Sequence, residues 1–122
     1  MLIQPMNPIS FGYKSIVKTL YKQGQLPTVV KDIYGQKLTP SNVTLEHIIP
    51  KSKKGASSLK NYALATAKAN QQRSSEPLLK HTTIENIKAY LEQFKGINKP
   101  QFNGDEYIKG VTNTLRRINI DV

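Results

Sequence analysis

The chain contains no cysteine, and it has no apolar run long enough to cross a bilayer. Without thiols it can form neither a disulfide bond nor a zinc site built on thiolates, which fits a reducing compartment. A membrane-spanning helix needs roughly 20 consecutive apolar residues, and no stretch approaches that length. The segment from Met1 to Tyr13 lacks a basic start followed by a long apolar run, so we expect no secretory signal. These absences predict a cytoplasmic protein with no membrane attachment.

Acidic residues are also scarce, since 8 Asp and Glu stand against 18 Lys and Arg, which gives a formal net charge of +10. That excess predicts attraction to polyanions through phosphate contacts that weaken with salt. A basic surface without a specific partner stays open as the alternative, because charge alone does not identify a ligand. The length of 122 residues fits a single domain over 1–122, and the hydrophobic content of 38% allows a modest core.

The expected elements place strands and a short helix between flanking helices. Apolar residues at helical spacing predict an N-terminal helix within residues 12–24, after an extended lead-in over residues 1–11. Runs of β-branched and apolar residues predict short strands over Thr28–Ile33, Val43–Ile49 and Tyr62–Ala65. Thr66 is a good N-cap for a helix over Ala67–Arg73.

A helical extension is expected over residues 82–122. Thr82 and Glu85 have the spacing of a capping box in front of an apolar helical pattern. Residues 98–104 are interpreted as a linker, and Asp105 as the start of the last helix.

The segment Leu45-Glu46-His47-Ile48-Ile49-Pro50 places an acid beside a histidine at the end of an apolar run. A basic loop follows, and then come Asn61 and Asn70. A carboxylate, an imidazole and an amide oxygen can together hold one hard divalent cation and activate a water beside it. Because the chain is strongly basic, the natural substrate for such a site is a phosphodiester.

From about Ile33 to Pro77 the chain resembles the HNH endonuclease family and its ββα-metal site. The resemblance rests on an ordered set of segments, which are Leu45 to Ser52, Gly55, Leu59 to Asn61, Leu64-Ala65 and Asn70 to Arg73. It implies an α+β protein whose small ββα-metal (HNH, or His-Me finger) core spans 28–77. One N-terminal helix and two C-terminal helices flank that core. Many members carry zinc-binding cysteine pairs, but Tyr34-Gly35 and Ala69 occupy such places here, so no structural zinc is expected and the flanking helices must supply the missing packing.

The resemblance also implies roles for single residues. His47 corresponds to the general base that deprotonates the attacking water. Glu46, where the family more often has aspartate, and Asn70 correspond to the protein ligands of the metal. Asn61 corresponds to an asparagine of the catalytic set that braces the loop and helps to orient the histidine. Arg73 stands where many members carry a basic residue that can reach a phosphate.

General chemistry is consistent with those roles. Magnesium prefers oxygen ligands and keeps several waters, so Mg²⁺ is the expected cofactor, with Mn²⁺ or Zn²⁺ as alternatives. A histidine with an ordinary pKa near 6.5 suits proton removal at neutral pH. The side chains expected to hold the nucleic-acid backbone are Lys51, Lys53, Lys54, Lys60, Lys68 and Arg73.

Adjacent residues on a regular strand point to opposite faces, so a shared site requires the strand to bend or end near Glu46 and His47. We therefore expect irregular backbone over residues 46–48. Taken singly, each residue also has an ordinary interpretation: Glu46 and His47 as a surface pair, Asn61 as a turn residue and Asn70 as an exposed helical residue. His81 is interpreted as an exposed residue that leads into a helix, with a third metal ligand as the alternative.

The sequence therefore predicts a metal-dependent HNH endonuclease that hydrolyses DNA. Two alternatives stay open, which are a catalytically inactive HNH-like module that binds nucleic acid and a protein-interaction domain with a basic surface. RNA remains a second candidate substrate. The sequence does not define the cleavage specificity, the choice between nicking and double-strand cutting, or the oligomeric state.

Overall fold

The computed structural model describes residues 15–122, so the lead-in expected over residues 1–11 lies outside the described residues. The described α-helices are α2 (Ile16–Lys22), α3 (Ala67–Arg73), α4 (Ile84–Glu92) and α5 (Gly104–Arg116), and short 3-10 helices span Lys51–Lys53, Leu59–Asn61 and Leu78–Lys80. The described strands are β1 (Val43–His47), β2 (Tyr62–Thr66), β3 (Asn98–Lys99) and β4 (Phe102–Asn103). This mixture of helices and short antiparallel strands confirms the predicted α+β class.

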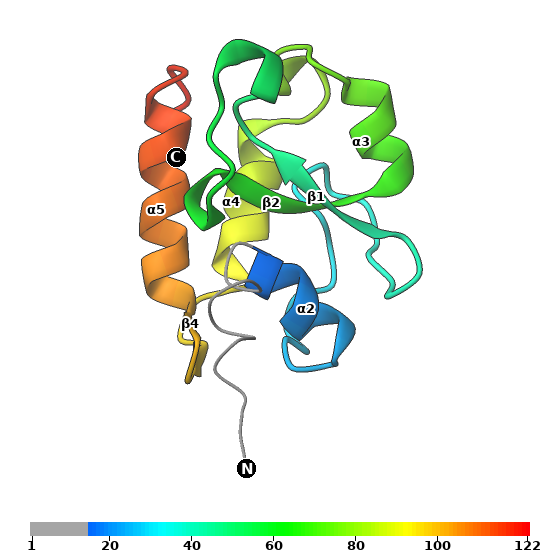
Figure 1. The fold of residues 1–122 in the computed structure, drawn as a ribbon, viewed down its shortest axis with the longest axis vertical. Coiled ribbons are helices and arrows are strands. Elements are labelled where there is room, and N and C mark those ends of the chain that lie inside the picture. Colours follow the sequence, from blue (N-terminus) through cyan, green and yellow to red (C-terminus); the bar gives the residue numbers. More distant parts are fainter. Residues whose placement is uncertain (1–14) are drawn as a thin grey trace.

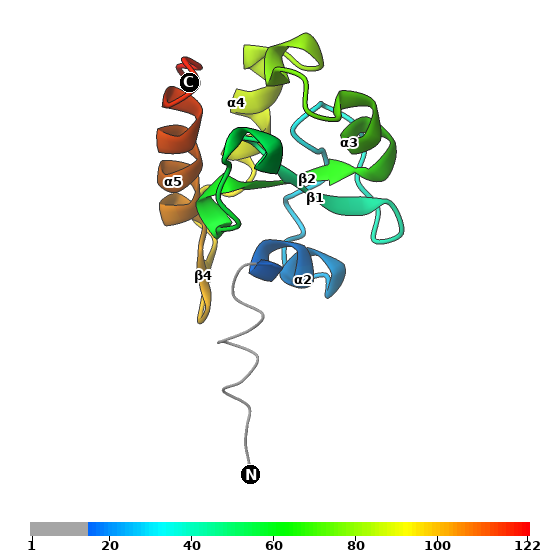
Figure 2. The same cartoon turned by 45° about the horizontal axis from the view of Figure 1, so that its top comes forward.

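The β1–β2 hairpin lies at the centre of the molecule, with α3 on one side of it and α2 on the other (Figures 1 and 2). The two strands pair antiparallel in a continuous register, from Val43 opposite Thr66 to His47 opposite Tyr62. Because the ladder is regular through His47, the expectation of irregular backbone is wrong for Glu46 and His47. The bend begins only at Ile48, where the strand has ended.

The segment Thr28–Ile33 does not form the expected strand, and only one isolated bridge joins Lys31 to Lys37. Its backbone is held by Gln93, which follows α4. The Gln93 Oε1 accepts hydrogen bonds from the amides of Val30 (2.9 Å) and Lys31 (3.0 Å). A side chain therefore satisfies the polar groups that a neighbouring strand would otherwise pair.

The β2–α3 connection follows the prediction closely. The Thr66 hydroxyl accepts a hydrogen bond from the amide of Ala69 (3.2 Å) and caps α3. The cap of α4 lies one residue later than predicted, because the Thr83 side chain accepts from the Asn86 amide. Thr82 instead donates its hydroxyl to the carbonyl of Ile33 (2.9 Å) and ties the start of α4 to the core.

The expected linker over residues 98–104 contains a small hairpin of β3 and β4, with Asn98 opposite Asn103. Asn103 then caps α5 by accepting a hydrogen bond from the Glu106 amide (2.9 Å). Gly110 in α5 brings the helix close to the hairpin, since a Cβ placed there would come within 3.0 Å of Lys60 Cβ. Gly110 therefore permits the close packing of α5 against the segment that precedes β2.

Two buried tyrosines connect the C-terminal helices to the edge of β2 that faces away from β1. The Leu64 amide donates to the hydroxyl of Tyr90 (2.8 Å), and the Tyr90 and Tyr107 hydroxyls lie 2.9 Å apart. The Tyr107 hydroxyl donates to the carbonyl of Tyr62 (2.6 Å). The flanking helices thus stabilise the hairpin by packing and by hydrogen bonds, as expected for a chain without zinc-binding cysteines.

A continuous core joins the β1–β2 hairpin to α2, α4 and α5, and Val17, Ile33, Ala63, Leu64, Ile87, Phe94, Val111 and Leu115 in it are fully buried. Within residues 15–122, none of the helices has the length and apolar character that a membrane crossing would require.

Candidate functional site

The two sides of β1 carry different parts of the predicted site. Thr44 and Glu46 share one side, because alternate residues of a strand point the same way. Helix α3 covers that side, since Asn70 contacts Thr44 and Arg73 contacts Glu46. His47 projects from the opposite side of the strand. The structure therefore brings Glu46 and Asn70 to one face and does not gather all three predicted side chains around one point.

Glu46 is buried, with 4% of its surface exposed. Its Oε2 accepts a short hydrogen bond from the hydroxyl of Tyr34 and lies 3.5 Å from Nη1 of Arg73. Burial raises the pKa of Glu46, while the Tyr34 hydroxyl and the positive charge of Arg73 act in the opposite direction. The carboxylate is thus an internal group with two fixed partners and is not a surface residue.

Asn70 lies on the first full turn of α3, half-buried against β1. Its Nδ2 donates to the hydroxyl of Thr44 (3.0 Å) and to the carbonyl of Leu45 (3.2 Å). A carbonyl can only accept, so this contact fixes which end of the amide faces the strand. Within the described residues no hydrogen bond uses Asn70 Oδ1. The amide oxygen is therefore oriented and available to a ligand.

His47 is half-buried at the end of β1. Its Nε2 lies 3.4 Å from the hydroxyl of Ser57, and its ring meets the ring of Tyr62 edge-on, with 4.9 Å between centroids. Burial, helped by the positive charge of Lys51, lowers the pKa of His47 below its ordinary value of 6.5. Both effects favour the neutral imidazole, which is the form that can accept a proton.

Asn61 closes the loop that follows His47. Its Oδ1 accepts from the amide of Ile49 (2.9 Å), and its Nδ2 donates to the carbonyls of Ile49 (3.0 Å) and Ala56 (2.8 Å). The backbone of Asn61 also accepts from the Ile48 amide (2.9 Å). Asn61 therefore acts on the backbone beside His47, and no hydrogen bond in the described part of the chain joins its side chain to the imidazole.

Arg73 does not have the exposure that a phosphate contact would need, because only 1% of its surface is accessible. Its guanidinium donates to the carbonyls of His47 (2.8 Å), Ile48 (2.9 Å) and Glu76 (2.7 Å). This corrects the expectation that Arg73 binds nucleic acid. The residue instead holds the backbone at the end of β1 and offsets the charge of Glu46.

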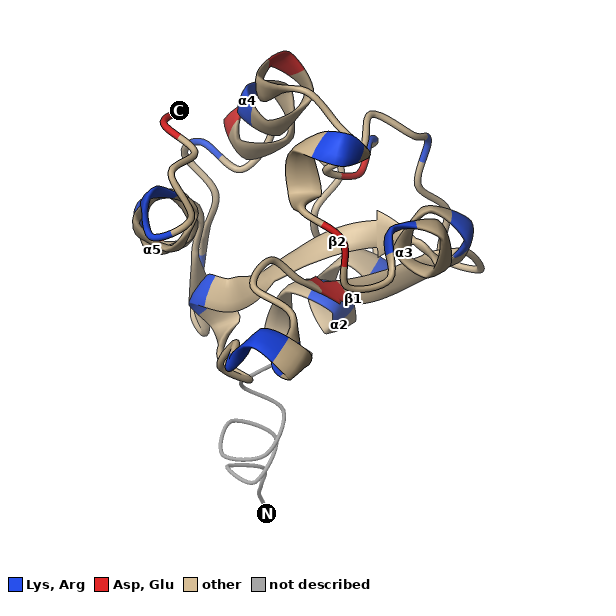
Figure 3. Ribbon diagram, turned by 90° about the horizontal axis from the view of Figure 1, so that it is seen from above, with Lys and Arg blue, Asp and Glu red and all other residues tan. Residues whose placement is uncertain are grey.

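The residues between the end of β1 and the start of β2 include the lysine loop, residues 50–56, which carries Lys51, Lys53 and Lys54. All three lysines are exposed, as are Lys60 and Lys68, and no ion pair within the described residues neutralises any of the five. Gly55 lets the loop close tightly, because a Cβ there would overlap the carbonyl of Ile49. Basic segments are spread widely over the ribbon, and acidic ones are few (Figure 3).

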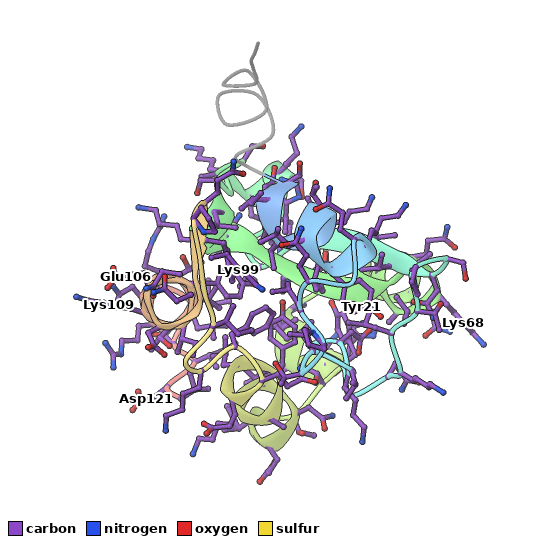
Figure 4. The ribbon with its side chains drawn as sticks, turned by 90° about the horizontal axis from the view of Figure 1, so that it is seen from below. Tyr21, Lys68, Lys99, Glu106, Lys109 and Asp121 are labelled. Carbon is purple, nitrogen blue, oxygen red and sulfur yellow. The ribbon has the colours of Figure 1, made fainter. Side chains whose placement is uncertain are left out.

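Lys68 stands apart from the lysine loop. It projects from α3 at the edge of the molecule far from α5, whereas Lys109 projects at the α5 edge (Figure 4). Lys68 lines a polar hollow of about 260 Å³ with Tyr34 and His81. His81 is itself engaged, since its Nε2 lies 2.6 Å from Oε1 of Glu76. The described residues therefore give no support to His81 as a third metal ligand beside Glu46.

The donor set of this site fits a hard divalent cation with few protein ligands. Among residues 15–122, no three His, Cys, Asp or Glu side chains cluster in a way that could hold a metal ion. A cation here would use the carboxylate of Glu46 and the oriented Oδ1 of Asn70, with water or phosphate oxygens completing its coordination. Mg²⁺ is commonly bound in this way. Arg73 beside Glu46 reduces the negative charge that such an ion would meet.

Tyr34 and Thr44 are the site residues that the sequence interpretation missed. In the sequence, Tyr34 only stands where a cysteine pair often lies in the family, yet in the structure its hydroxyl contacts Glu46. Thr44 anchors the Asn70 amide. The spacing of Thr44 two residues before Glu46 on a strand places both on one face, and this signal was present in the sequence.

One family comparison bears on this site. Residues 30–77 match the model of a family described as HNH endonuclease. No curated protein and no solved structure matches the chain. The matched residues contain β1, the lysine loop, β2 and α3. The part of the chain that carries Glu46, His47, Asn61 and Asn70 therefore matches the HNH endonuclease family, which confirms the resemblance found in the sequence and indicates a nuclease-type function.

Proposed function

We propose that the protein is a metal-dependent endonuclease that hydrolyses phosphodiester bonds in DNA. The observation that carries the proposal is the arrangement around the end of β1. Glu46 and Asn70 share the face that α3 covers, and His47 terminates the strand beside the exposed lysines of the lysine loop. A hard-cation donor pair, a neutral imidazole and exposed ammonium groups are the components that phosphodiester hydrolysis needs.

Glu46 and Asn70 would hold the divalent ion, with Mg²⁺ as the first candidate. When bound, such an ion stabilises the negative charge that develops on the phosphate and on the leaving oxygen. The protein contributes orientation, since Thr44 and the carbonyl of Leu45 fix the amide of Asn70. Preorganisation of this kind lowers the reorganisation required during the reaction.

His47 would remove the proton from the attacking water. The water oxygen would form a new bond to phosphorus as its proton passes to the imidazole, the bond from phosphorus to the leaving oxygen would break, and the leaving oxygen would take a proton from solvent water. The lowered pKa of His47 keeps the ring neutral and ready to accept at neutral pH. Tyr62 packs against the ring and Arg73 holds the His47 carbonyl, so the base is restrained through both its side chain and its backbone.

The lysines Lys51, Lys53 and Lys54 would contact the phosphates that flank the cleaved bond, with Lys60 following on the same connection between the strands. These contacts carry no sequence information, so they support binding and positioning but not specificity. They also predict that affinity falls steeply with salt.

The experiment that tests this proposal is cleavage of a supercoiled plasmid by the purified protein. Reactions contain Mg²⁺, Mn²⁺ or Zn²⁺ in turn, each with and without an excess of EDTA. We expect nicked or linear product with Mg²⁺ or Mn²⁺ and no product in EDTA. Undiminished cutting in EDTA would contradict the metal requirement, and a lack of product with every ion would contradict the nuclease function.

A second candidate function is binding of nucleic acid without cleavage. The observation that favours it is the engagement of Glu46 by both Tyr34 and Arg73, which a cation would have to accommodate. This candidate predicts salt-sensitive DNA binding with no turnover under any of the three ions. A gel-shift titration performed beside the plasmid assay separates the two functions.

A further inference from the structure

The Tyr34 hydroxyl makes a contact that joins two segments of the described core. Tyr34 precedes the hairpin and is 6% exposed, and its hydroxyl donates to Oε2 of Glu46 in β1. The phenol therefore meets the one carboxylate that the candidate metal site contains. No other tyrosine in the described residues makes a hydrogen bond to Glu46.

The turn that carries Tyr34 is rigid enough to place this hydroxyl. Asp32 is 1% exposed, and its Oδ1 accepts from the amides of Tyr34 (2.9 Å) and Gln36 (2.7 Å). Its Oδ2 accepts from the Thr66 amide (2.8 Å), which ties the turn to β2. Gly35 adopts a φ of +82°, a conformation that suits glycine. The position of the phenol is therefore set by the fold.

Glu46 needs such a partner, because a glutamate side chain has three rotatable bonds and loses that freedom when it is ordered. Arg73 approaches the same oxygen from α3 at 3.5 Å. Tyr34 and Arg73 thus hold Oε2 from two elements and fix the rotation of the carboxylate. A carboxylate with a fixed rotation presents its oxygens to a cation in one arrangement and needs no reordering.

We propose that Tyr34 is a positioning residue for cation binding, whose hydroxyl orients the carboxylate of Glu46 toward a divalent ion. The inference rests on the proposed function only in taking Glu46 as a metal ligand. It adds a residue from outside the hairpin and helix that carry the other members of the site.

The test measures Mn²⁺ binding to the full-length protein by isothermal titration calorimetry, with no nucleic acid present. The variants are Tyr34→Phe, which removes only the hydroxyl, Glu46→Gln, and the double variant. Tyr90→Phe is the matched control, because it also removes a buried, hydrogen-bonded hydroxyl, at a site that does not contact Glu46.

We expect Tyr34→Phe to weaken Mn²⁺ binding by about 10-fold, as is typical for loss of a group that orients a metal ligand. Tyr90→Phe should leave the affinity unchanged. The double variant should bind no more weakly than Glu46→Gln, because Tyr34 acts through that carboxylate. Unchanged affinity in Tyr34→Phe, together with a loss in Glu46→Gln, would overturn the positioning role and leave the proposed function in place. Unchanged Mn²⁺ affinity in Glu46→Gln would instead show that Glu46 is not a metal ligand. It would overturn both the positioning role of Tyr34 and the metal site of the proposed function.

A second measurement covers the case in which Tyr34→Phe does not fold. The wild-type protein is labelled with ¹³C at the ring carbon that bears the hydroxyl, and Mg²⁺ is added during NMR observation. The Tyr34 signal should shift with Mg²⁺ while the Tyr90 signal stays in place. A second sample, labelled with ¹³C at the glutamate side-chain carboxyl carbons, reports on Glu46 in the same titration. A stationary Tyr34 signal at Mg²⁺ concentrations that shift the Glu46 carboxyl signal would overturn the inference.

Discussion

Substitution of Asn61 by alanine should destabilise the fold strongly, because one side chain closes the lysine loop. Asn61 is 3% exposed, so water cannot readily replace its contacts. Its amide makes three hydrogen bonds to backbone, at 2.9, 3.0 and 2.8 Å. At about 1 kcal/mol each, their loss predicts a decrease of about 3 kcal/mol in the free energy of unfolding. That is a large fraction of the roughly 5–15 kcal/mol expected for a domain.

The assay is urea unfolding followed by circular dichroism. With a denaturant slope of about 1–3 kcal/mol/M, the midpoint of Asn61→Ala should fall by roughly 1–3 M and the slope should not change. The control is Asn86→Ala, which removes one long amide contact of 3.4 Å to the Tyr34 carbonyl. That variant should lose less than about 1 kcal/mol. If both variants lose the same small amount, the bracing role of Asn61 is refuted.

Three further predictions concern the charged groups. The His47 ring should titrate below pH 6.5 in an NMR titration, and Lys51→Ala should raise its pKa, because it removes a nearby positive charge. Alanine at all three lysines of the lysine loop should weaken DNA binding and reduce the slope of log K against log salt by roughly 0.9 for each lost phosphate contact in gel shifts. Arg73→Met should cost about 3–5 kcal/mol in urea unfolding, because it leaves Glu46 buried without its cation. This loss should shrink at acid pH, where protonation removes the charge of Glu46.

Each of these predictions has a contradicting result. A His47 pKa at or above 6.5 would show that burial does not determine the pKa of the ring. An unchanged salt slope in the triple lysine variant would place the nucleic-acid contacts elsewhere. A stability loss in Arg73→Met that is the same at acid and neutral pH would show that the pairing with Glu46 contributes little, and would leave the three carbonyl contacts as the main role of Arg73.

The helices and strands of the site could be predicted from the sequence better than the tertiary contacts that their side chains make. Thr66 and the helix after it follow from capping and periodicity, which act over a few residues. The family resemblance from about Ile33 to Pro77 was also readable, because polar and apolar positions follow one another in a fixed order, and the family match over residues 30–77 confirms it. The observed N-cap of α4 is Thr83 and not the predicted Thr82, because the Thr82 hydroxyl donates to the Ile33 carbonyl. Only the tertiary fold creates that contact.

The burial of Glu46 and Arg73 could not be deduced from the sequence. A basic residue at the end of a helix is usually exposed, and the inward direction of Arg73 depends on carbonyls left unpaired where β1 ends. Likewise, Thr28–Ile33 has strand composition, yet Gln93 satisfies its backbone. In both cases a side chain distant in sequence supplies the partner, and local propensity carries no information about it.

We expect His47 to act in the chemical step and not in DNA binding. The measurement that separates these roles compares the single-turnover cleavage rates of wild type and His47→Ala at saturating protein on one labelled DNA, with affinity measured in EDTA for both proteins. We expect the rate to fall by about 10²–10⁴-fold while the affinity and the unfolding midpoint stay close to wild type. A His47→Ala variant that cuts at the wild-type rate would show that His47 is not the general base.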